Sequence, residues 1–187
     1  HLRDTLMAGF TTIRDLGTEG AGYADVELKQ AVEQGIIPGP RMIVVTRAIV
    51  ATGSYAPKGF ALEWPVPQGA EEADGNDLIR VVRDQIGHGA DWVKLYGDYH
   101  WEPGPGARPT FSLDEMKLAV EIARNAHAPV AVHAATPEGM RRAALAGAAL
   151  GVDRDRSREQ AAAGGQRRRP HPGHGAMGGA SGGTNAG

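Results

Sequence analysis

Two short apolar segments, residues 91–96 (DWVKLY) and 129–134 (PVAVHA), each carry one polar side chain near their end. Apolar and β-branched residues dominate both segments, which is typical of strands buried in a parallel sheet. Lys94 lies in the first segment and His133 in the second. Because the carboxyl ends of parallel strands meet at one edge of a sheet, we expect Lys94 and His133 to lie at the same edge.

Helical and strand-like periodicities alternate around this pair of segments. Ser112 and Glu115 form a capping-box pattern at the start of one helix, and Thr136 precedes Pro137 as an N-cap residue at the start of another. We expect the helix over 23–35 to place Val26, Leu28, Ala31 and Val32 near one face. The long loops are expected over 47–76 and 97–111. The periodicity predicts strands over 11–16, 41–46, 91–96 and 129–134, and helices over 2–9, 23–35, 77–87, 112–128 and 137–147.

Four strand–helix units in succession predict an α/β fold with parallel strands and right-handed crossovers. The pattern leaves two architectures open, a doubly wound sheet and part of an eight-stranded barrel. Both place their chemistry at the carboxyl ends of the strands, where Asp15, Lys94 and His133 lie. The two long loops leave from the same ends, so we expect a substrate pocket there.

The doubly wound alternative has one motif to test, the segment 17–22 (GTEGAG) between the first strand and the next helix. Its glycines give the spacing G-x-x-G-x-G, whereas a dinucleotide loop requires G-x-G-x-x-G. The spacing favours glycines that serve a strand-to-helix turn over a nucleotide site.

Lys94 and His133 each allow a structural and a functional interpretation. A strand lysine often faces solvent, and an isolated histidine in an apolar strand is often a core residue bonded to a carbonyl. A buried amine, however, tends to lose its proton and can then act as a base or take up carbon dioxide as a carbamate. Neutral imidazole is the commonest metal ligand. Their placement on neighbouring strands makes the pair more informative than either residue alone, and both interpretations stay open at this point.

Composition limits the alternatives. The chain has 187 residues, a formal net charge of -2 and no cysteine, which excludes disulfides and thiolate ligands. The charge gives no reason to expect nucleic acid or a membrane as partner, and we expect a cytoplasmic protein. Residues 153–187 contain no Leu, Ile, Val, Phe, Tyr or Trp, so we predict one folded domain over 1–150 and a disordered tail over 151–187.

Several segments resemble the amidohydrolase superfamily of metal-dependent hydrolases, specifically the branch similar to imidazolonepropionases and Xaa-Pro dipeptidases. They are 8–20 (AGFTTIRDLGTEG), 37–55 (IPGPRMIVVTRAIVATGSY), 89–99 (GADWVKLYGDY) and 109–147 (PTFSLDEMKLAVEIARNAHAPVAVHAATPEGMRRAALAG). The resemblance implies a (β/α)8 barrel, here in part, that hydrolyses an amide or other C-N bond of a small molecule or dipeptide.

The resemblance also implies a divalent-metal centre, commonly zinc. Lys94 matches the carboxylated lysine of the family's fourth strand, and His133 matches the histidine of its fifth. Substrate contacts are expected from Tyr96, Tyr99 and the loop that carries Ser54 and Tyr55.

The sequence also departs from the family pattern. It shows no H-x-H strand, no sixth-strand histidine and no eighth-strand aspartate, so no catalytic acid or base is assigned. The composition of 151–187 is typical of a gene read out of frame, and we hypothesise a frameshift near 150 in a chain that lacks its start. We therefore expect weak or no hydrolysis. Two alternatives remain: a non-catalytic half-barrel that forms a homo-oligomer, and an RNA-binding tail around Arg167, Arg168 and Arg169.

Overall fold

The computed structural model describes residues 1–55, 69–100 and 106–149, which all belong to one structural unit, His1–Arg154. The tail predicted over 151–187 lies outside the described residues. Strands and helices alternate along the unit, which confirms the predicted α/β class. The elements are α1 (Leu2–Met7), β1 (Thr12–Arg14), α2 (Ala24–Glu33), β2 (Arg41–Ile43), β3 (Ala48–Val50), β4 (Ala70–Glu72), α3 (Asp77–Gly87), β5 (Val93–Tyr96), β6 (Asp98–His100), β7 (Ala107–Pro109), α4 (Leu113–Asn125), β8 (Val130–His133) and α5 (Pro137–Ala146).

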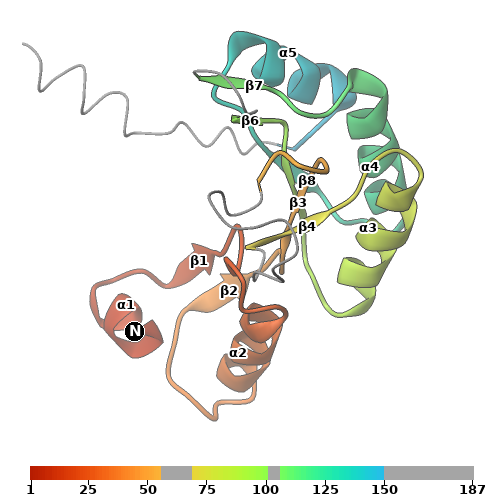
Figure 1. The fold of residues 1–187 in the computed structure, drawn as a ribbon. Helices are drawn as coiled ribbons and strands as arrows, with labels where there is room; N and C mark the ends of the chain where they lie inside the picture. Colours follow the sequence, from red (N-terminus) through yellow and green to blue (C-terminus); the bar gives the residue numbers. More distant parts are fainter. Residues whose placement is uncertain (56–68, 101–105, 150–187) are drawn as a thin grey trace, which may run out of the picture. The chain divides into compact units, whose positions relative to one another are not determined.

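The main sheet contains four parallel strands in the order β4-β3-β5-β8. A parallel pair, β1 and β2, and an antiparallel hairpin, β6 and β7, complete the described strands. Helices α3, α4 and α5 lie along one side of the main sheet (Figure 1). Parallel strands with helical crossovers on one side are the arrangement expected for part of a (β/α) barrel.

The larger hydrophobic cluster fills the space between this sheet and its helices. Leu95 from β5, Val132 from β8, Val81 from α3 and Met116 from α4 are all at most 2% exposed within it. Helix α4 packs against both α3 and α5, so it forms the middle of the helical layer. Burial of this apolar surface is the main term that stabilises the layer.

The predicted starts of α4 and α5 are confirmed. The Ser112 hydroxyl accepts a hydrogen bond from the Glu115 backbone N–H at 3.2 Å, and the Glu115 carboxylate accepts one from the Ser112 backbone N–H at 2.8 Å. The Thr136 hydroxyl accepts from the Gly139 backbone N–H at 3.0 Å, with Pro137 in the first helical turn. These bonds satisfy amide groups that have no partner inside the helix.

The strand predicted over 41–46 is shorter than expected, since β2 ends at Ile43 and β3 begins only at Ala48. Thr46 lies between them with a φ of 65°, a left-handed conformation that a β-branched residue rarely adopts. The backbone therefore leaves the extended conformation at Thr46 and resumes it two residues later.

Both long loops contain strands that the sequence did not indicate. β3 and β4 lie within the loop predicted over 47–76, and β6 and β7 within the one predicted over 97–111. Three-residue strands are too short to show a periodicity of their own, and they form here because neighbouring strands supply hydrogen-bonding partners. The expected burial of Leu28 is also wrong, because its side chain is 43% exposed on α2.

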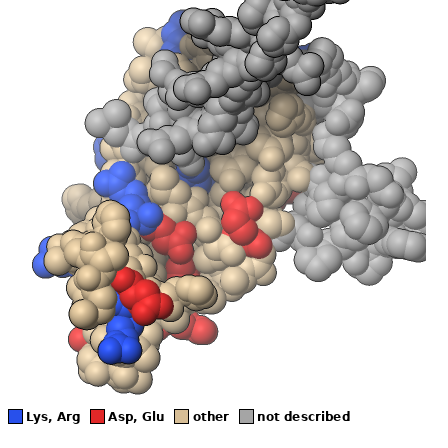
Figure 2. Space-filling model, turned by 90° about the vertical axis from the view of Figure 1, so that its left-hand side faces the viewer, with Lys and Arg blue, Asp and Glu red and all other residues tan. Residues whose placement is uncertain are grey.

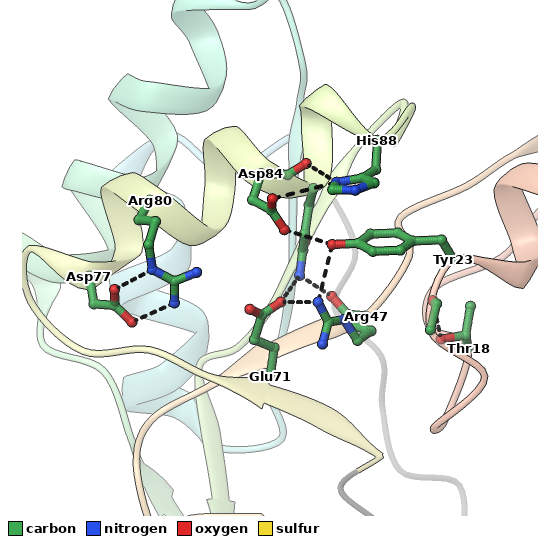
Figure 3. A network of polar contacts seen from close by, with 10 residues as sticks. Thr18, Tyr23, Arg47, Glu71, Asp77, Arg80, Asp84 and His88 are labelled. Atoms are coloured by element: carbon green, nitrogen blue, oxygen red, sulfur yellow. Dashed lines mark hydrogen bonds and ion pairs between the residues drawn. The ribbon is translucent and has the colours of Figure 1, made fainter.

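A smaller hydrophobic cluster lies around α2 and β2, where Val26, Met42 and Val44 are buried. A polar network connects the start of α2 with α3 and β4 (Figure 3). In it, the Tyr23 ring stacks on His88 at 4.1 Å, and its hydroxyl donates to Asp84 at 2.7 Å. Arg47 pairs with Glu71 at 3.0 Å and also donates to the Tyr23 hydroxyl at 3.1 Å, so charged and aromatic groups join the two clusters.

Charged side chains of both signs are interspersed on the face shown in Figure 2. Acidic and basic groups lie beside one another among the residues drawn in colour, rather than in separate areas. The described part of this face therefore presents a mixed field to an approaching ligand.

Candidate metal and substrate site

Alternation along β5 and β8 separates the side chains of these strands onto two faces. Val93 and Leu95 belong to the helix-covered cluster, so Lys94 and Tyr96 lie on the opposite face, called here the inner face. The register pairs Lys94 with Ala131 and Tyr96 with His133. Paired residues share a face, so the structure brings Lys94 and His133 together on the inner face of adjacent strands.

Lys94 is buried. Its exposed fraction is 1%, and it is the largest of the fully buried side chains in the described residues. The Nζ atom lies 5.7 Å from the centre of the Tyr96 ring. The solvent-facing interpretation of this lysine is therefore excluded, and the amine is held in a largely desolvated position.

His133 closes β8 with its side chain 16% exposed. Its ring lies 5.2 Å from the ring of Tyr96 and 6.3 Å from that of Tyr99. The Nε2 atom lies 3.9 Å from the Oδ1 atom of Asp98. The imidazole is thus accessible at the strand end and is surrounded by polar and aromatic groups rather than by aliphatic core.

Asp98 is a site residue that the sequence did not single out, because it follows the strand in a segment predicted as loop. Its side chain is completely buried. Both carboxylate oxygens accept from the Ala135 backbone N–H, and Oδ2 also accepts from the backbone N–H and the hydroxyl of Thr136, each at 2.7 Å. The only sequence signal was an acidic residue four positions after a strand lysine.

Three tyrosines form an aromatic group beside His133. The ring centres of Tyr55, Tyr96 and Tyr99 lie 5.1 to 5.5 Å apart. The hydroxyls of Tyr55 and Tyr96 donate to the two carboxylate oxygens of Glu19, at 2.6 and 3.2 Å. Burial and the Glu19 carboxylate raise the pKa of both hydroxyls well above the ordinary value, so both stay protonated donors near neutral pH.

Ser54 and Asp15 have local partners. Ser54 is completely buried, and its hydroxyl donates to the Ala51 carbonyl at 2.7 Å within the turn that carries Tyr55. The Asp15 carboxylate accepts from the Gly17 backbone N–H at 3.1 Å. In this arrangement the Ser54 hydrogen bond stabilises the turn, and the neighbouring Tyr55 packs against Tyr96 and Tyr99.

The residues present fit part of a divalent-cation site. A buried amine and an imidazole on adjacent strands supply a nitrogen ligand and, if the lysine is carboxylated, an oxygen ligand. Within residues 1–55, 69–100 and 106–149, no three His, Cys, Asp or Glu side chains gather closely enough to hold a metal ion by themselves. Lys94 and His133 are thus the donors that these residues offer on the inner face.

Comparison with known proteins shows the family of the chain. Residues 1–165 match the amidohydrolase family. The chain belongs to the amidohydrolase family. A search of curated proteins found no match. Among solved structures, the fold is similar to an amidohydrolase (34% identity, TM-score 0.67) and to a Xaa-Pro dipeptidase with methionine bound in its active site (32%, 0.68), each match covering 79% of this chain and 38% of the other.

Two further amidohydrolase-like structures share the fold. One is a prolidase in complex with N-methylphosphonate-L-proline, with 32% identity and a TM-score of 0.66 over 79% of this chain and 38% of that one. The other is the A. niger ochratoxinase, with 26% identity and a TM-score of 0.65 over 79% and 37%. The chain spans 37–38% of the length of these structures, and the partial barrel that the sequence predicted is confirmed.

None of the helices in the described residues has both the length and the apolar character that crossing a membrane requires.

Proposed function

We propose that Lys94 and His133 contribute to a metal-dependent site that hydrolyses an amide or other C-N bond. The observation that carries this proposal is the burial of Lys94 at 1% exposure on the inner face, one strand away from His133. Burial of an amine is costly unless the amine is neutral, hydrogen-bonded or paired, and such lysines are candidates for a specific role. Family membership gives that role a reaction class, since amidohydrolases act on C-N bonds.

Lys94 is proposed to act as a carbamate. A desolvated, neutral amine is nucleophilic, and its Nζ can form a bond to the carbon of carbon dioxide with loss of one proton. The product carries one negative charge shared by two oxygens, which are suitable ligands for one or two divalent ions. The Tyr96 ring at 5.7 Å from Nζ limits the space around that group.

His133 is proposed as a nitrogen ligand of the same centre, with zinc as the expected ion. When bound, such an ion lowers the pKa of a coordinated water and polarises a carbonyl group. The protein's own contribution is to hold the imidazole at the strand end, between Asp98 and the rings of Tyr96 and Tyr99. The residues that would complete the ligand set are not assigned in this sequence.

The proposed substrate is a small amide or a dipeptide. Solved relatives include a dipeptidase with methionine in its active site and a prolidase with a proline phosphonate, so compact ligands of this kind suit the fold. Tyr55, Tyr96 and Tyr99 offer ring faces and hydroxyls beside His133, and Ser54 fixes the turn that bears Tyr55. A cytoplasmic location stays a prediction.

Metal titration of the whole chain tests this proposal. We expect a divalent ion, supplied as zinc or cobalt, to bind, and Lys94→Ala and His133→Ala each to weaken binding at least about tenfold. Lys117→Ala is the matched control, because that lysine is half exposed on α4 and its removal should leave binding unchanged. Bicarbonate labelled with ¹³C should give a carbamate signal in NMR that Lys94→Ala removes.

Equal metal affinity in wild type and in both site variants would reject the assignment. A panel of dipeptides that includes Xaa-Pro substrates, assayed with and without a chelator, then tests hydrolysis separately. We expect this activity to be weak, and turnover that a chelator leaves unchanged would contradict the metal-dependent reaction.

A self-associating half-barrel is the second candidate. Large apolar side chains are exposed around α1 and α2, with Met7 at 76%, Phe10 at 62% and Ile36 at 69%. In addition, β1 pairs only with β2 among the described residues, which leaves its other edge free, whereas the outer edge of β8 accepts a bond from Ala149 at Val130. Sedimentation velocity should show a homo-oligomer that Phe10→Ser weakens and Leu145→Ser does not, whereas a monomer at all concentrations would exclude this candidate.

A further inference from the structure

We propose that Asp98 is a positioning residue that fixes the ring orientation and the tautomer of His133. The inference rests on the proposed role of His133 as a metal ligand for its functional meaning. The geometry points to a buried carboxylate whose Oδ1 atom lies beside one ring nitrogen of His133, Nε2. Asp98 is the only carboxylate among the described residues for which an ion-pair contact with His133 is seen.

Asp98 is itself held rigidly. Four donor contacts reach its carboxylate, two from the Ala135 backbone N–H at 2.9 and 3.0 Å and two from Thr136 at 2.7 Å. Its exposed fraction is 0%. A buried carboxylate with several hydrogen bonds has one well-defined position. Asp98, which follows β5, therefore connects this strand to the turn between β8 and α5. His133 is the last residue of β8 before that turn.

The two carboxylate oxygens of Asp98 have different surroundings. Oδ2 accepts all of the Thr136 bonds, whereas Oδ1 accepts one bond from Ala135 and lies 3.9 Å from Nε2 of His133. This separation is longer than a hydrogen bond, so Oδ1 acts on the neutral ring through its charge. A negative oxygen near Nε2, with little solvent to screen it, favours a proton on that nitrogen.

A proton on Nε2 determines what the opposite nitrogen can do. In the neutral ring, Nδ1 then carries the lone pair and is the atom able to bind a metal ion. Carboxylate groups that orient metal-binding histidines in this way are common, and their removal typically lowers metal affinity about 10- to 100-fold.

Two glycines are required for this contact. A Cβ at Gly139 would lie 2.3 Å from Oδ2 of Asp98, so only glycine leaves room for the carboxylate beside the first turn of α5. A Cβ at Gly97 would lie 3.1 Å from the His133 carbonyl oxygen, whose bond from the Gly97 N–H is 2.8 Å long. Both glycines permit close approach of backbone and side chain around His133 and Asp98.

The first test is the tautomer of His133 in the wild-type chain. ¹⁵N NMR of the imidazole, assigned by comparison with His133→Gln and recorded where the ring is neutral, reports which nitrogen carries the proton. We expect the proton on Nε2. A proton on Nδ1 in the wild type would overturn the proposal, and this measurement requires no bound metal.

The second test is Asp98→Asn. The carbonyl oxygen of the amide can keep the bonds from Ala135 and Thr136, which places its NH₂ group opposite Nε2 of His133. An N–H donor at that place favours an unprotonated Nε2, so we expect the tautomer to shift toward Nδ1–H. Asp25→Asn is the matched control, because Asp25 is also buried and accepts backbone bonds from Val26 and Thr46.

A folded Asp98→Asn variant with the wild-type tautomer would overturn the proposal, as would a tautomer shift in Asp25→Asn of the same size. Zinc affinity gives an independent reading, with a weakening of about 10- to 100-fold expected for Asp98→Asn and none for Asp25→Asn. If the wild-type chain binds no zinc, the proposed function fails, while the tautomer still decides the positioning role of Asp98.

Discussion

The two faces of the main sheet differ sharply although the same strands supply both. On the helix-covered face, β5 and β8 contribute Val93, Leu95, Val130 and Val132, all 2% exposed or less. On the inner face, the alternate positions carry Lys94, Tyr96, Ala131 and His133. One face is uniformly aliphatic, and the other combines an amine, an imidazole and a phenol.

Within each strand, the side chains on one face contribute to stability, and those on the other face carry the polar groups of the candidate site. The aliphatic face gains free energy from burial against α3 and α4. The inner face buries polar groups, whose desolvation must be offset by hydrogen bonds or ion pairs rather than by apolar contacts. Substitutions on one face should therefore change the free energy of unfolding, and those on the other should change ligand binding.

Leu95→Ala should have the largest effect on stability. Leu95 is completely buried in the helix-covered cluster, and its truncation leaves a cavity that costs about 2 to 5 kcal/mol of unfolding free energy. Urea denaturation followed by circular dichroism measures the change. Leu145→Ala, at a side chain 55% exposed on α5, should stay within about 0.5 kcal/mol of wild type. Similar losses in both variants would contradict the comparison.

Gly97→Ala should destabilise the fold by about 1 to 3 kcal/mol through overpacking. The added Cβ would lie 2.7 Å from Cγ1 of Val132 and 2.9 Å from Cε of Met116. Gly87→Ala is the control, since a Cβ there meets nothing within 4 Å and alanine favours a helix by up to about 1 kcal/mol. If both variants unfold at the same urea concentration, the close approach of β5 and β8 is not required.

Lys94→Met tests the inner face. Methionine fills a similar volume but has no amine, so the unfolding free energy of this variant reports what the contacts of the amine contribute. Divalent-ion binding should disappear in the same variant. Thermal or urea unfolding together with metal titration measures both. A loss of about 3 kcal/mol or more would instead identify Lys94 as a member of a structural ion pair.

The smallest effect concerns the tyrosines. Burial and Glu19 raise the pKa of Tyr55 and Tyr96 in the folded state above the unfolded value of about 10. Their neutral forms therefore stabilise the fold fully below pH 10, and this contribution is lost as pH rises beyond it. Tyrosinate absorbance against pH should show both groups titrating late.

Glu19→Gln should shift the titration of Tyr55 and Tyr96 toward lower pH, because the variant removes a negative charge next to both hydroxyls. Glu121→Gln, on the exposed side of α4, is the control and should leave the titration unchanged. Titration of all the tyrosines near the ordinary value in the wild type would argue against the Glu19 contacts.

Long elements were predictable from the sequence, and short ones were not. Helix α4 shows its capping box and its apolar stripe in the sequence, so its start at Leu113 was determined locally. A strand of three residues such as β3 depends on partners far along the chain, which here are β4 and β5. Thr46 interrupts a continuous apolar segment through its backbone conformation, which composition does not reveal.

The candidate site was predictable only in part, for the same physical reason. Lys94 and His133 stand out because each is a polar residue in an apolar strand. Asp98 and Glu19 do not, because each lies in a polar segment where an acid is ordinary. Their importance comes from contacts across 35 or more residues, to His133 and to Tyr55.

By itself, the sequence determined the alternation of strands and helices, the starts of α4 and α5, and the two polar side chains at the strand ends. These features depend on local periodicity, capping and residue type. Only the tertiary structure decided that Lys94 is buried, that Asp98 holds the corner beside His133, and that Glu19 joins two tyrosines. Those relations depend on the register of β5 against β8 and on close packing at Gly97 and Gly139, which no local pattern specifies.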